Sequence, residues 1–337
     1  MRTIGLDYTQ RILTERDIPP PRLERDDDVL FRVCEVGVCG TDRELSAFRV
    51  GYPPAHEDFL VLGHEAVGQV LETGRAVALL KPGDWVAPMI RRSCSPPCAS
   101  CARGRRDLCL TGGFRERGIF GEHGYFTEYA VDSVHDLVPV PPELADRAVL
   151  IEPLSVVEKA VATALRLHPL EPRSALVLGA GAIGILAALA FQARGLAVSV
   201  HSLEPSDHAR VRLLEAAGVR YLTSIEGERH DVVLEATGSP DAALAGLRAL
   251  APAGVCCVLG APSSAGELPF RDLILKNQIV FGSVNASPEA FAAALADLAR
   301  FDRDPISRLI RRARFSDLHQ TISGPPGDAP KVVHVVS

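Results

Sequence analysis

The run GAGAIG at 179–184 constrains the fold of this chain more than any other stretch of its sequence. It fits the pattern G-x-G-x-x-G, and it stands between an apolar run at 175–178 and an alanine-rich run that predicts a helix. In that setting the first glycine permits a tight turn, the second lets the backbone approach a pyrophosphate, and the third lets helix and strand pack closely. The pattern therefore predicts a dinucleotide site, whose residues are Gly179, Gly181, Ala182, Ile183 and Gly184.

The sequence around this turn alternates between apolar strands and helices. Runs such as LAVSVHS, DVVLEATGS and GVCCVLGA predict strands, and helical or loop segments separate them. Repeated strand–helix units of this kind predict a parallel sheet wound on both faces, over about 156–286. From about 27 to 90 the chain instead shows short β runs with glycine and proline between them. We therefore expect an α/β protein of two domains, which a length of 337 residues also favours.

Composition excludes several classes of function. The net charge is −6, and basic residues do not cluster strongly enough to predict a nucleic-acid partner. The first residues, MRTIGLDYTQ, lack the apolar segment of a signal peptide. Apolar runs all fall short of the ~18 residues that a membrane span needs. We expect a cytoplasmic protein that binds neither nucleic acid nor membrane.

Four of the eight cysteines fall within one short segment, which we call the cysteine lobe, 91–112. In a cytoplasmic chain such crowding indicates a metal site rather than disulfides. Tetrahedral zinc takes four sulfur ligands, and short loops can supply them. Because four thiolates leave no open coordination position, we expect this zinc to be structural. Its predicted ligands are Cys94, Cys98, Cys101 and Cys109.

A second group of candidate ligands is scattered over the sequence. Cys39 lies in the run GVCGTD, His64 and Glu65 lie in GHE, and Glu152 lies in LIEPLSVVEKA. A catalytic zinc takes about three protein ligands and keeps one position open. Spacing alone does not bring these residues together. Each of them taken singly is more often a core cysteine, a hydrogen-bonded histidine or a surface acid.

The runs GVCGTD, GHE, GAGAIG, EATGSP and GSVNA, together with the cysteine lobe, resemble the zinc-dependent medium-chain dehydrogenases. Within that superfamily the chain is most similar to the glucose (aldose) 1-dehydrogenase branch, along nearly its whole length, and the runs specific to that branch are CGTDRE, RERGI, IEPLSVVEKA and FGSVNA. The resemblance implies a GroES-like, mostly-β catalytic domain over 1–155 and a Rossmann domain, with a doubly wound parallel sheet, over 156–286. It also implies that the segment 287–337 returns to the catalytic domain.

The resemblance assigns roles to particular residues. The predicted ligands of the catalytic zinc are Cys39, His64 and Glu152. Of the predicted catalytic residues, Thr41 would relay the proton of the substrate hydroxyl, Asp42 would orient the ligand histidine, and Glu65 would exchange on and off the metal. The predicted sugar contacts are Glu116, His123, Glu152 and Asn285. The predicted dinucleotide contacts beyond the glycine turn are Thr237, Gly238 and Asn285. His123 is suggested only by its place in the turn GEHGYF. A turn histidine that does not contact the substrate is an equal alternative.

The choice between NAD and NADP depends on the end of the second predicted strand. Glu204 lies about 20 residues beyond the glycine turn, where an acid binds the ribose diol of NAD. We find no arginine in that corner of the sequence, which weakens the case for a 2′-phosphate. The alternative is that Glu204 is a solvated loop residue. The predicted cofactor is therefore NAD(P), with a lean toward NAD.

The resemblance implies oxidation of a cyclic, glucose-like aldose at C1 to the aldonolactone, with hydride transfer to NAD(P)+. It implies one catalytic and one structural zinc per subunit, a small-molecule sugar as the partner, and a homotetramer or homodimer. One departure from the family pattern is the three-residue first gap of the cysteine lobe, so that either the loop bulges or Cys94 binds weakly. The other is Val156, which stands where some sugar-active relatives carry an aspartate. A polyol, amino-cyclitol or alcohol dehydrogenase is thus one alternative, and a dinucleotide-binding protein without turnover is the other.

Overall fold

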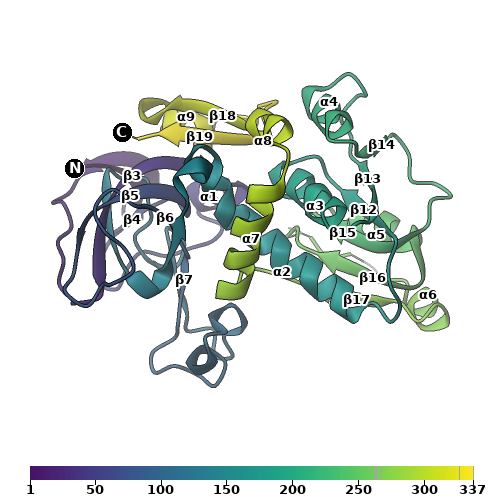
Figure 1. Ribbon diagram of the computed structural model, residues 1–337, viewed down its shortest axis with the longest axis horizontal. Coiled ribbons are helices and arrows are strands. Elements are labelled where there is room, and N and C mark those ends of the chain that lie inside the picture. The colour runs from purple at the N-terminus through teal and green to yellow at the C-terminus, as the bar shows by residue number, and fades with distance from the viewer. Residues whose placement is uncertain (262–263, 267, 326, 337) are drawn as a thin grey trace.

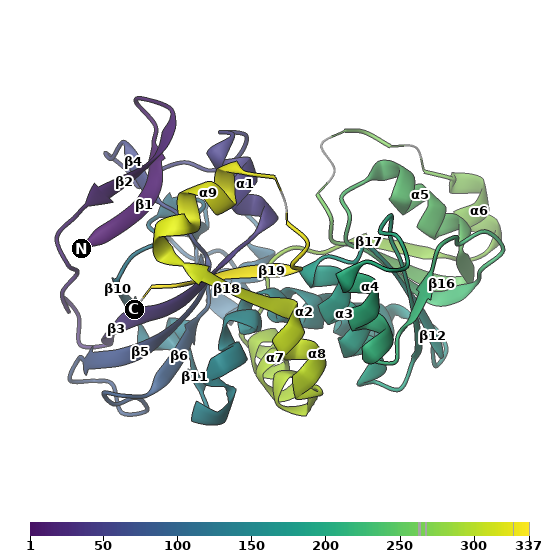
Figure 2. The same cartoon turned by 90° about the horizontal axis from the view of Figure 1, so that it is seen from above.

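The computed structural model describes residues 1–261, 264–266, 268–325 and 327–336. A mostly-β body holds the N-terminus, and a body built on a parallel sheet lies beside it (Figures 1 and 2). The C-terminal segment, yellow in both views, runs from the second body back onto the first. The cysteine lobe projects from the rest of the molecule beyond β7 (Figure 1).

The first body consists mainly of short strands. The runs that predict strands between 27 and 90 appear as β3, β5 and β6, whereas the N-terminal hairpin of β1 and β2 has no counterpart in the prediction. Its strands are β1 (Arg2–Asp7), β2 (Ile12–Asp17), β3 (Asp28–Val38), β4 (Phe59–Val61), β5 (Glu65–Thr73), β6 (Trp85–Pro88), β7 (Arg91–Arg92), β8 (Arg115–Arg117), β9 (Gly121–Glu122), β10 (Tyr129–Ser133) and β11 (Leu137–Val140). Its helical segments are α1 (Gly40–Ser46), η1 (Cys101–Arg103), η2 (Arg106–Leu108), η3 (Val134–Asp136) and η4 (Pro142–Leu150).

The central sheet of the first body is completed by the C-terminal segment. Within the described ranges its strand order is β11-β6-β5-β3-β19-β18, and β10 also pairs with β3. Strand β19 (Lys331–Val335) lies antiparallel to β3, and β18 (Ile310–Arg314) lies parallel to β19. The rest of that segment is α7 (Pro288–Arg300), α8 (Arg303–Leu309), η5 (Phe315–Asp317) and α9 (Leu318–Ser323).

The second body is a doubly wound parallel sheet, as the strand–helix pattern predicts. Its strand order over the described residues is β14-β13-β12-β15-β16-β17, and every neighbouring pair is parallel. This is the Rossmann order, with β12 and β15 at the point where the winding reverses. The strands are β12 (Ser174–Leu178), β13 (Ala197–His201), β14 (Arg220–Leu222), β15 (His230–Glu235), β16 (Leu250–Val258) and β17 (Ile279–Gly282). The helices are α2 (Ile151–Leu167), α3 (Ala182–Gln192), α4 (Ala209–Ala216), α5 (Pro240–Arg248) and α6 (Phe270–Leu275).

Helix α2 joins the two bodies through a shared apolar core. Its buried residue Leu154 belongs to the same cluster as Val67 and Ala87 of the first body and Ile185 and Phe291 of α3 and α7. The fully buried strands of the parallel sheet explain why runs such as SALVL are apolar without alternation. A packed core, rather than a linker alone, therefore holds the two bodies together.

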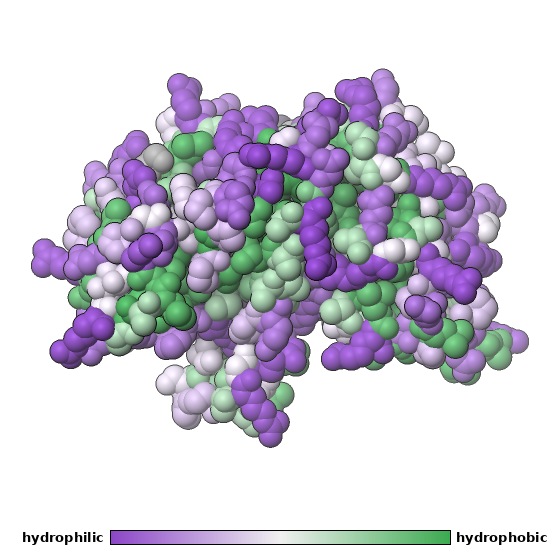
Figure 3. Space-filling view, viewed as in Figure 1, coloured by the Kyte–Doolittle hydropathy of each residue, from purple (hydrophilic) through white to green (hydrophobic). Residues whose placement is uncertain are grey.

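The helices in the described part of the chain are all too short or too polar to cross a membrane. Figure 3 shows hydrophilic residues around the rim of one face and more apolar residues toward its centre.

Candidate active site

A cysteine, a histidine and a glutamate meet where strand β3 of the central sheet ends and its neighbour β5 begins. Cys39 directly follows β3, and His64 and Glu65 lie at the start of β5, which pairs antiparallel with β3. One candidate ligand atom from each of the three lies within 4.8 Å of the others. Gly37 pairs with Glu65 across the strands, and a Cβ at Gly37 would lie 2.3 Å from Glu65 Oε2. A side chain at this position would therefore displace the carboxylate of Glu65 from its present place.

Asp42 supports the cluster from helix α1. Its Oδ2 accepts a hydrogen bond from the Cys39 backbone N at 2.8 Å, and its Oδ1 lies 3.5 Å from His64 Nδ1. Burial alone would lower the pKa of His64, but Asp42 and Cys39 outweigh it and raise that pKa well above its usual value. Thr41 Oγ1 lies 3.9 Å from Cys39 Sγ. The chain thus brings together a thiol, an imidazole and an acid that holds the imidazole, which is the donor chemistry that zinc takes.

Lys331 of β19 is a functional neighbour that the sequence did not reveal. Its Nζ lies 2.7 and 2.6 Å from the two carboxylate oxygens of Glu65, and it also donates to Val38 O at 3.3 Å. Both Lys331 and Glu65 are buried. A lysine 266 residues away therefore neutralises the acid beside the candidate ligands.

Glu152 lies in the first turn of α2 and is buried, but it is not a member of the close cluster. Burial raises its pKa to about 8; His64 and Lys331 oppose that rise, and Glu65 adds to it. His64, Glu65 and Lys331 are thus among the charged neighbours that act on Glu152. Its role as the third zinc ligand stays a prediction, and Glu65 is the acid that belongs to the close cluster.

The predicted sugar contacts Glu116 and Asn285 come from the two bodies and touch each other. Asn285 Nδ2 donates to Glu116 Oε1 at 2.7 Å, and Arg91 Nε donates to the same oxygen at 2.7 Å. Glu116 lies in β8 and is paired with Arg91 of β7, while Asn285 follows β17. All three side chains are buried. The hydrogen bond from Asn285 to Glu116 thus spans the two bodies.

The glycine turn has the geometry that a pyrophosphate requires. Gly179 has φ +106°, and a Cβ at Gly184 would lie 1.9 Å from Gly179 O, so side chains are excluded at both positions. A Cβ at Gly181, by contrast, would meet no described atom within 4 Å. Gly181 is also the N-cap of α3, which leaves open space at a helix N-terminus. The turn therefore fits a dinucleotide phosphate.

Thr237 and Gly238 lie at the same edge of the sheet, just beyond β15. The buried carboxylate of Glu235 accepts hydrogen bonds from the backbone N of both residues, at 2.5 and 3.0 Å. Sequence reasoning singled out the run EATGS but not Glu235, which fixes the conformation of the turn.

The corner that holds Glu204 contains an arginine, contrary to the expectation from the sequence. Arg210 Nη1 lies 2.8 Å from Glu204 Oε1, and Arg210 also donates to the backbone carbonyls of Gly327 and Asp328. Arg210 lies six positions further along, and α4 turns it back toward the end of β13. The argument for NAD from a missing arginine is therefore wrong.

The four cysteines of the lobe meet as predicted from their spacing. Their sulfur atoms lie within 4.8 Å of one another, and Cys94 Sγ is 3.7 Å from Cys101 Sγ. Tetrahedral zinc with Zn–S bonds of ~2.3 Å places its sulfurs about 3.8 Å apart, so the four thiols fit the ion. Hydrogen bonds lower the pKa of Cys98 to about 6 and that of Cys109 to about 7. Despite the longer first gap, Cys94 lies within the cluster.

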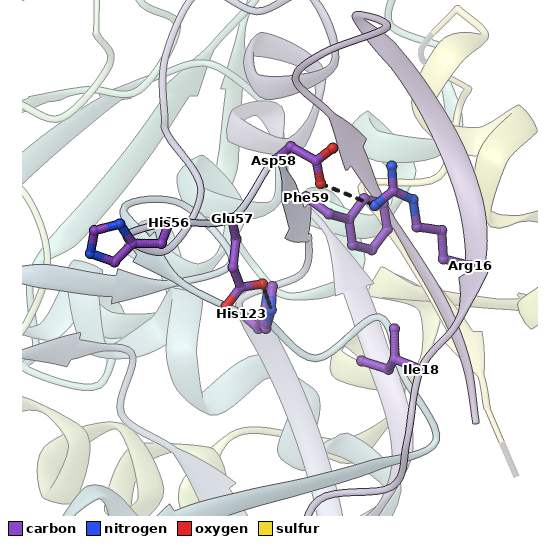
Figure 4. Close-up of a pocket in the computed structure, with 7 residues that line it drawn as sticks. All are labelled: Arg16, Ile18, His56, Glu57, Asp58, Phe59 and His123. Carbon is purple, nitrogen blue, oxygen red and sulfur yellow. Dashed lines mark hydrogen bonds and ion pairs between the residues drawn. The ribbon is translucent and has the colours of Figure 1, made fainter.

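His123 lies in a different place from the other predicted sugar contacts. It lines a surface pocket of about 540 Å³ together with Arg16, Ile18, His56, Glu57, Asp58 and Phe59. Its Nε2 lies 2.9 Å from Glu57 Oε2, and Figure 4 shows the two side chains meeting while the His56 ring points away. None of the other predicted site residues lines this pocket, so its part in sugar binding stays a prediction.

Comparison with known proteins shows to which family this arrangement belongs. The family described as "Glucose dehydrogenase C-terminus" matches residues 145–329, and the "Alcohol dehydrogenase GroES-like domain" matches residues 25–142. The chain is 41% identical over 326 residues to a glucose 1-dehydrogenase of Thermoproteus tenax, covering 90% of this chain and 91% of the relative. It is 37% identical over 350 residues to glucose 1-dehydrogenase 2 of Vulcanisaeta moutnovskia, covering 98% and 97%.

Among solved structures, the glucose dehydrogenase of Haloferax mediterranei in complex with NADP, Zn and gluconolactone superposes with a TM-score of 0.91. The two sequences are 30% identical, and the match covers 100% of this chain and 99% of the other. A GroES-like body, a Rossmann body and two metal-binding clusters together define a zinc-dependent medium-chain dehydrogenase. Within that class, the chain belongs to the glucose dehydrogenase family.

Proposed function

We propose that this enzyme oxidises a cyclic aldose of the glucose type at C1 to the aldonolactone and passes the hydride to NAD(P)+. The observation that carries the proposal is the pairing of a thiol–imidazole–carboxylate cluster with the Glu116–Asn285 contact between the two bodies. The glucose 1-dehydrogenases among its relatives, and the Haloferax enzyme that binds gluconolactone, support the same substrate.

The residues of the cluster have distinct tasks in this proposal. Cys39 and His64 would hold the catalytic zinc with Glu152 or Glu65, and Asp42 would hold the imidazole in place. The metal, when bound, supplies a Lewis acid that lowers the pKa of the sugar C1 hydroxyl. Thr41 passes the hydroxyl proton toward solvent.

The remaining tasks fall to the two walls of the cleft. Glu116 and Asn285 bind sugar hydroxyls and orient C1 toward the nicotinamide. When the dinucleotide is bound, its nicotinamide would supply the acceptor for the hydride of C1, and loss of that hydride and of the hydroxyl proton would leave the lactone carbonyl. The glycine turn and the turn at Thr237 and Gly238 hold the dinucleotide that accepts the hydride.

Initial rates on a panel of substrates test this function. D-glucose, D-galactose, D-xylose and simple alcohols would each be tried with NAD+ and NADP+, and the lactone would be detected as the product. We expect turnover of at least one aldose, and its loss in Thr41→Val with zinc retained. Oxidation of polyols or alcohols but of no aldose would overturn the sugar assignment and favour the alternative left open by Val156.

We propose that the enzyme uses both NAD and NADP, which it would bind at the corner beyond β13. Glu204 can bind the ribose diol of NAD, whereas Arg210 can bind the 2′-phosphate of NADP once it leaves Glu204. Comparison of kcat/KM for the two cofactors tests this. A preference of a hundredfold or more for either one would contradict it.

The assembly proposed from the family is a homodimer or homotetramer. Strand β17 lies at the edge of the parallel sheet, and beside it Phe270, Ile274 and Leu275 of α6 expose apolar side chains. A second copy pairing at this edge would cover them. Light scattering of the purified enzyme would test this, and a monomer would refute the proposal.

We also propose a cytoplasmic location, since none of the eight cysteines forms a disulfide.

A further inference from the structure

The cysteine lobe contains a buried acid that the predicted chemistry does not use. Asp107, in η2, has a fully buried side chain. Arg105 donates to both of its carboxylate oxygens, at 3.0 and 2.9 Å, and Lys159 Nζ lies 3.0 Å from Oδ2. The carbonyl oxygen of Asp107 accepts a further hydrogen bond from Arg91 Nη1 at 3.3 Å. One residue of the lobe thus binds three cations.

The first series of contacts runs from Asp107 through Arg91 to Glu116, the carboxylate that is predicted to contact the sugar. Arg91 binds Asp107 O with one nitrogen and Glu116 Oε1 with another, and its guanidinium lies 3.8 Å from the centre of the Phe114 ring. These contacts fix the plane of the guanidinium. Because Asn285 binds the same oxygen of Glu116, the other oxygen is left for a ligand hydroxyl. Arg91 therefore sets the direction in which the Glu116 carboxylate points.

The second line runs from Asp107 through Lys159 to the loop that carries Asn285. Lys159 of α2 donates to Val284 O at 2.9 Å while its Nζ also binds Asp107. The next residue, Asn285, has φ +59°, a left-handed conformation that asparagine adopts more readily than most non-glycine residues. Lys159 and Glu116 thus hold this loop at two adjacent residues, one by its backbone and one by its side chain.

We propose that Asp107 is a positioning residue for the sugar site, aligning Glu116 and Asn285 through Arg91 and Lys159. The proposal rests on the proposed function, which makes those two side chains the sugar contacts. It gives the cysteine lobe a task beyond its own stability, because the lobe then aligns the walls of the cleft contributed by both bodies.

Electrostatics gives the reason that a charge is needed at Asp107. Burial and the neighbouring Arg91 and Arg105 lower the pKa of Lys159, and only Asp107 opposes that trend among its main partners. Without the carboxylate, Lys159 would lose its anionic partner while Arg91 and Arg105 remain nearby. Lys159 would then leave Val284, and the Asp107 carbonyl that holds Arg91 would lose the side-chain contacts that fix its place.

The test compares Asp107→Asn with two control variants in the zinc-loaded enzyme. We expect Asp107→Asn to keep two zinc ions per chain and to raise KM for the aldose on the order of tenfold to a hundredfold. Its kcat at saturating sugar should fall less than about threefold, because the reacting groups are intact. Arg105→Gln removes another partner of Asp107 that touches neither wall of the cleft, and it should leave KM within about twofold of the wild-type value.

Hydrogen exchange provides a readout that does not depend on activity. Asp107→Asn should speed exchange in both 115–120 and 281–287, whereas Lys159→Met should speed it in 281–287 alone. An unchanged KM and unchanged exchange in Asp107→Asn would overturn the proposal. So would a rise in KM accompanied by loss of zinc, since Asp107 would then merely hold the lobe together. If the wild-type chain oxidises no aldose, the proposed function fails, and the exchange measurement still decides whether Asp107 positions both walls.

Discussion

Lys331→Met tests how the C-terminal strand supports the candidate zinc site. The change keeps the aliphatic stem and removes the ammonium group that lies 2.6 and 2.7 Å from the oxygens of Glu65. The side chains of Lys331 and Glu65 are only 4% and 1% exposed, so Glu65 would be left as an unpaired charge away from water. We expect the free energy of unfolding to fall by about 3–5 kcal/mol, the usual cost of removing one partner from a buried ion pair.

An exposed ion pair of equal length supplies the control. Arg75 and Asp26 also lie 2.6 Å apart, but their side chains are 84% and 54% exposed. Water screens that pair, so Arg75→Met should cost only about 0.2–1 kcal/mol. The contrast between the two variants isolates burial, because distance and charge are matched.

Urea titration followed by the fluorescence of Trp85 measures these effects. Trp85 is the one tryptophan of the chain and lies in β6, in the same sheet as Glu65 and Lys331. Glu65→Gln and the double variant complete a cycle, in which we expect a favourable coupling energy of about 2–3 kcal/mol. Zinc content would be measured for every variant, since Glu65 released from Lys331 is free to bind the metal.

The reasoning is refuted if Lys331→Met costs no more than Arg75→Met. It is also refuted if the effects of the two single changes simply add, because a buried pair requires that loss of the second partner costs less than loss of the first.

Cys101→Ser should lose one zinc per chain and lower the temperature of unfolding, because metal binding contributes to folding of the lobe; a wild-type protein with at most one zinc would contradict the two-zinc prediction. After chelation at pH 7, an alkylating reagent should modify Cys98 well before Cys101, as peptide mapping would show. Nearby backbone N–H groups lower the pKa of Cys98 to about 6, so it is mostly thiolate at that pH, while burial raises the pKa of Cys101 to about 12. Glu204→Ala should raise kcat/KM for NADP relative to NAD about tenfold, since it removes a like charge and releases Arg210, and adding Arg210→Ala should cancel the gain. Glu152→Ala should weaken binding of the catalytic zinc ~10-fold or more and lower kcat; full zinc with near-normal kcat on every substrate would refute the ligand role of Glu152.

The parts of the fold with short-range signals could be predicted from the sequence. The glycine turn is one, because a strained backbone at Gly179 and a tight approach at Gly184 leave no other residue type possible. The cysteine lobe is another, because all four thiols lie within one short segment. The strand–helix alternation likewise predicted the parallel sheet, in which every neighbouring pair except β12 and β15 is consecutive in sequence.

Long-range pairings could not be predicted in the same way. Glu116 and Asn285 are 169 residues apart, and only the packing of the two bodies brings them into contact. Arg210 was missed for a different reason. Helix α4 turns it back onto Glu204, and the residues next to Glu204 in the sequence do not indicate that turn. Glu152 shows a third limit. The resemblance implies that it is a zinc ligand, but its burial and its charged neighbours depend on the whole fold and could not be predicted from the sequence.

The place of β19 in the central sheet has a consequence for how the protein is made. Lys331 donates to the carbonyl of Val38, and these residues are 293 positions apart. At about 5–20 residues per second, a ribosome needs roughly 15 to 60 s to add that length of chain. During this interval β3 has no β19 beside it, and an unpaired strand edge can pair with other nascent chains. We therefore expect the N-terminal half to need protection at this strand edge during synthesis, and slow translation should increase its aggregation.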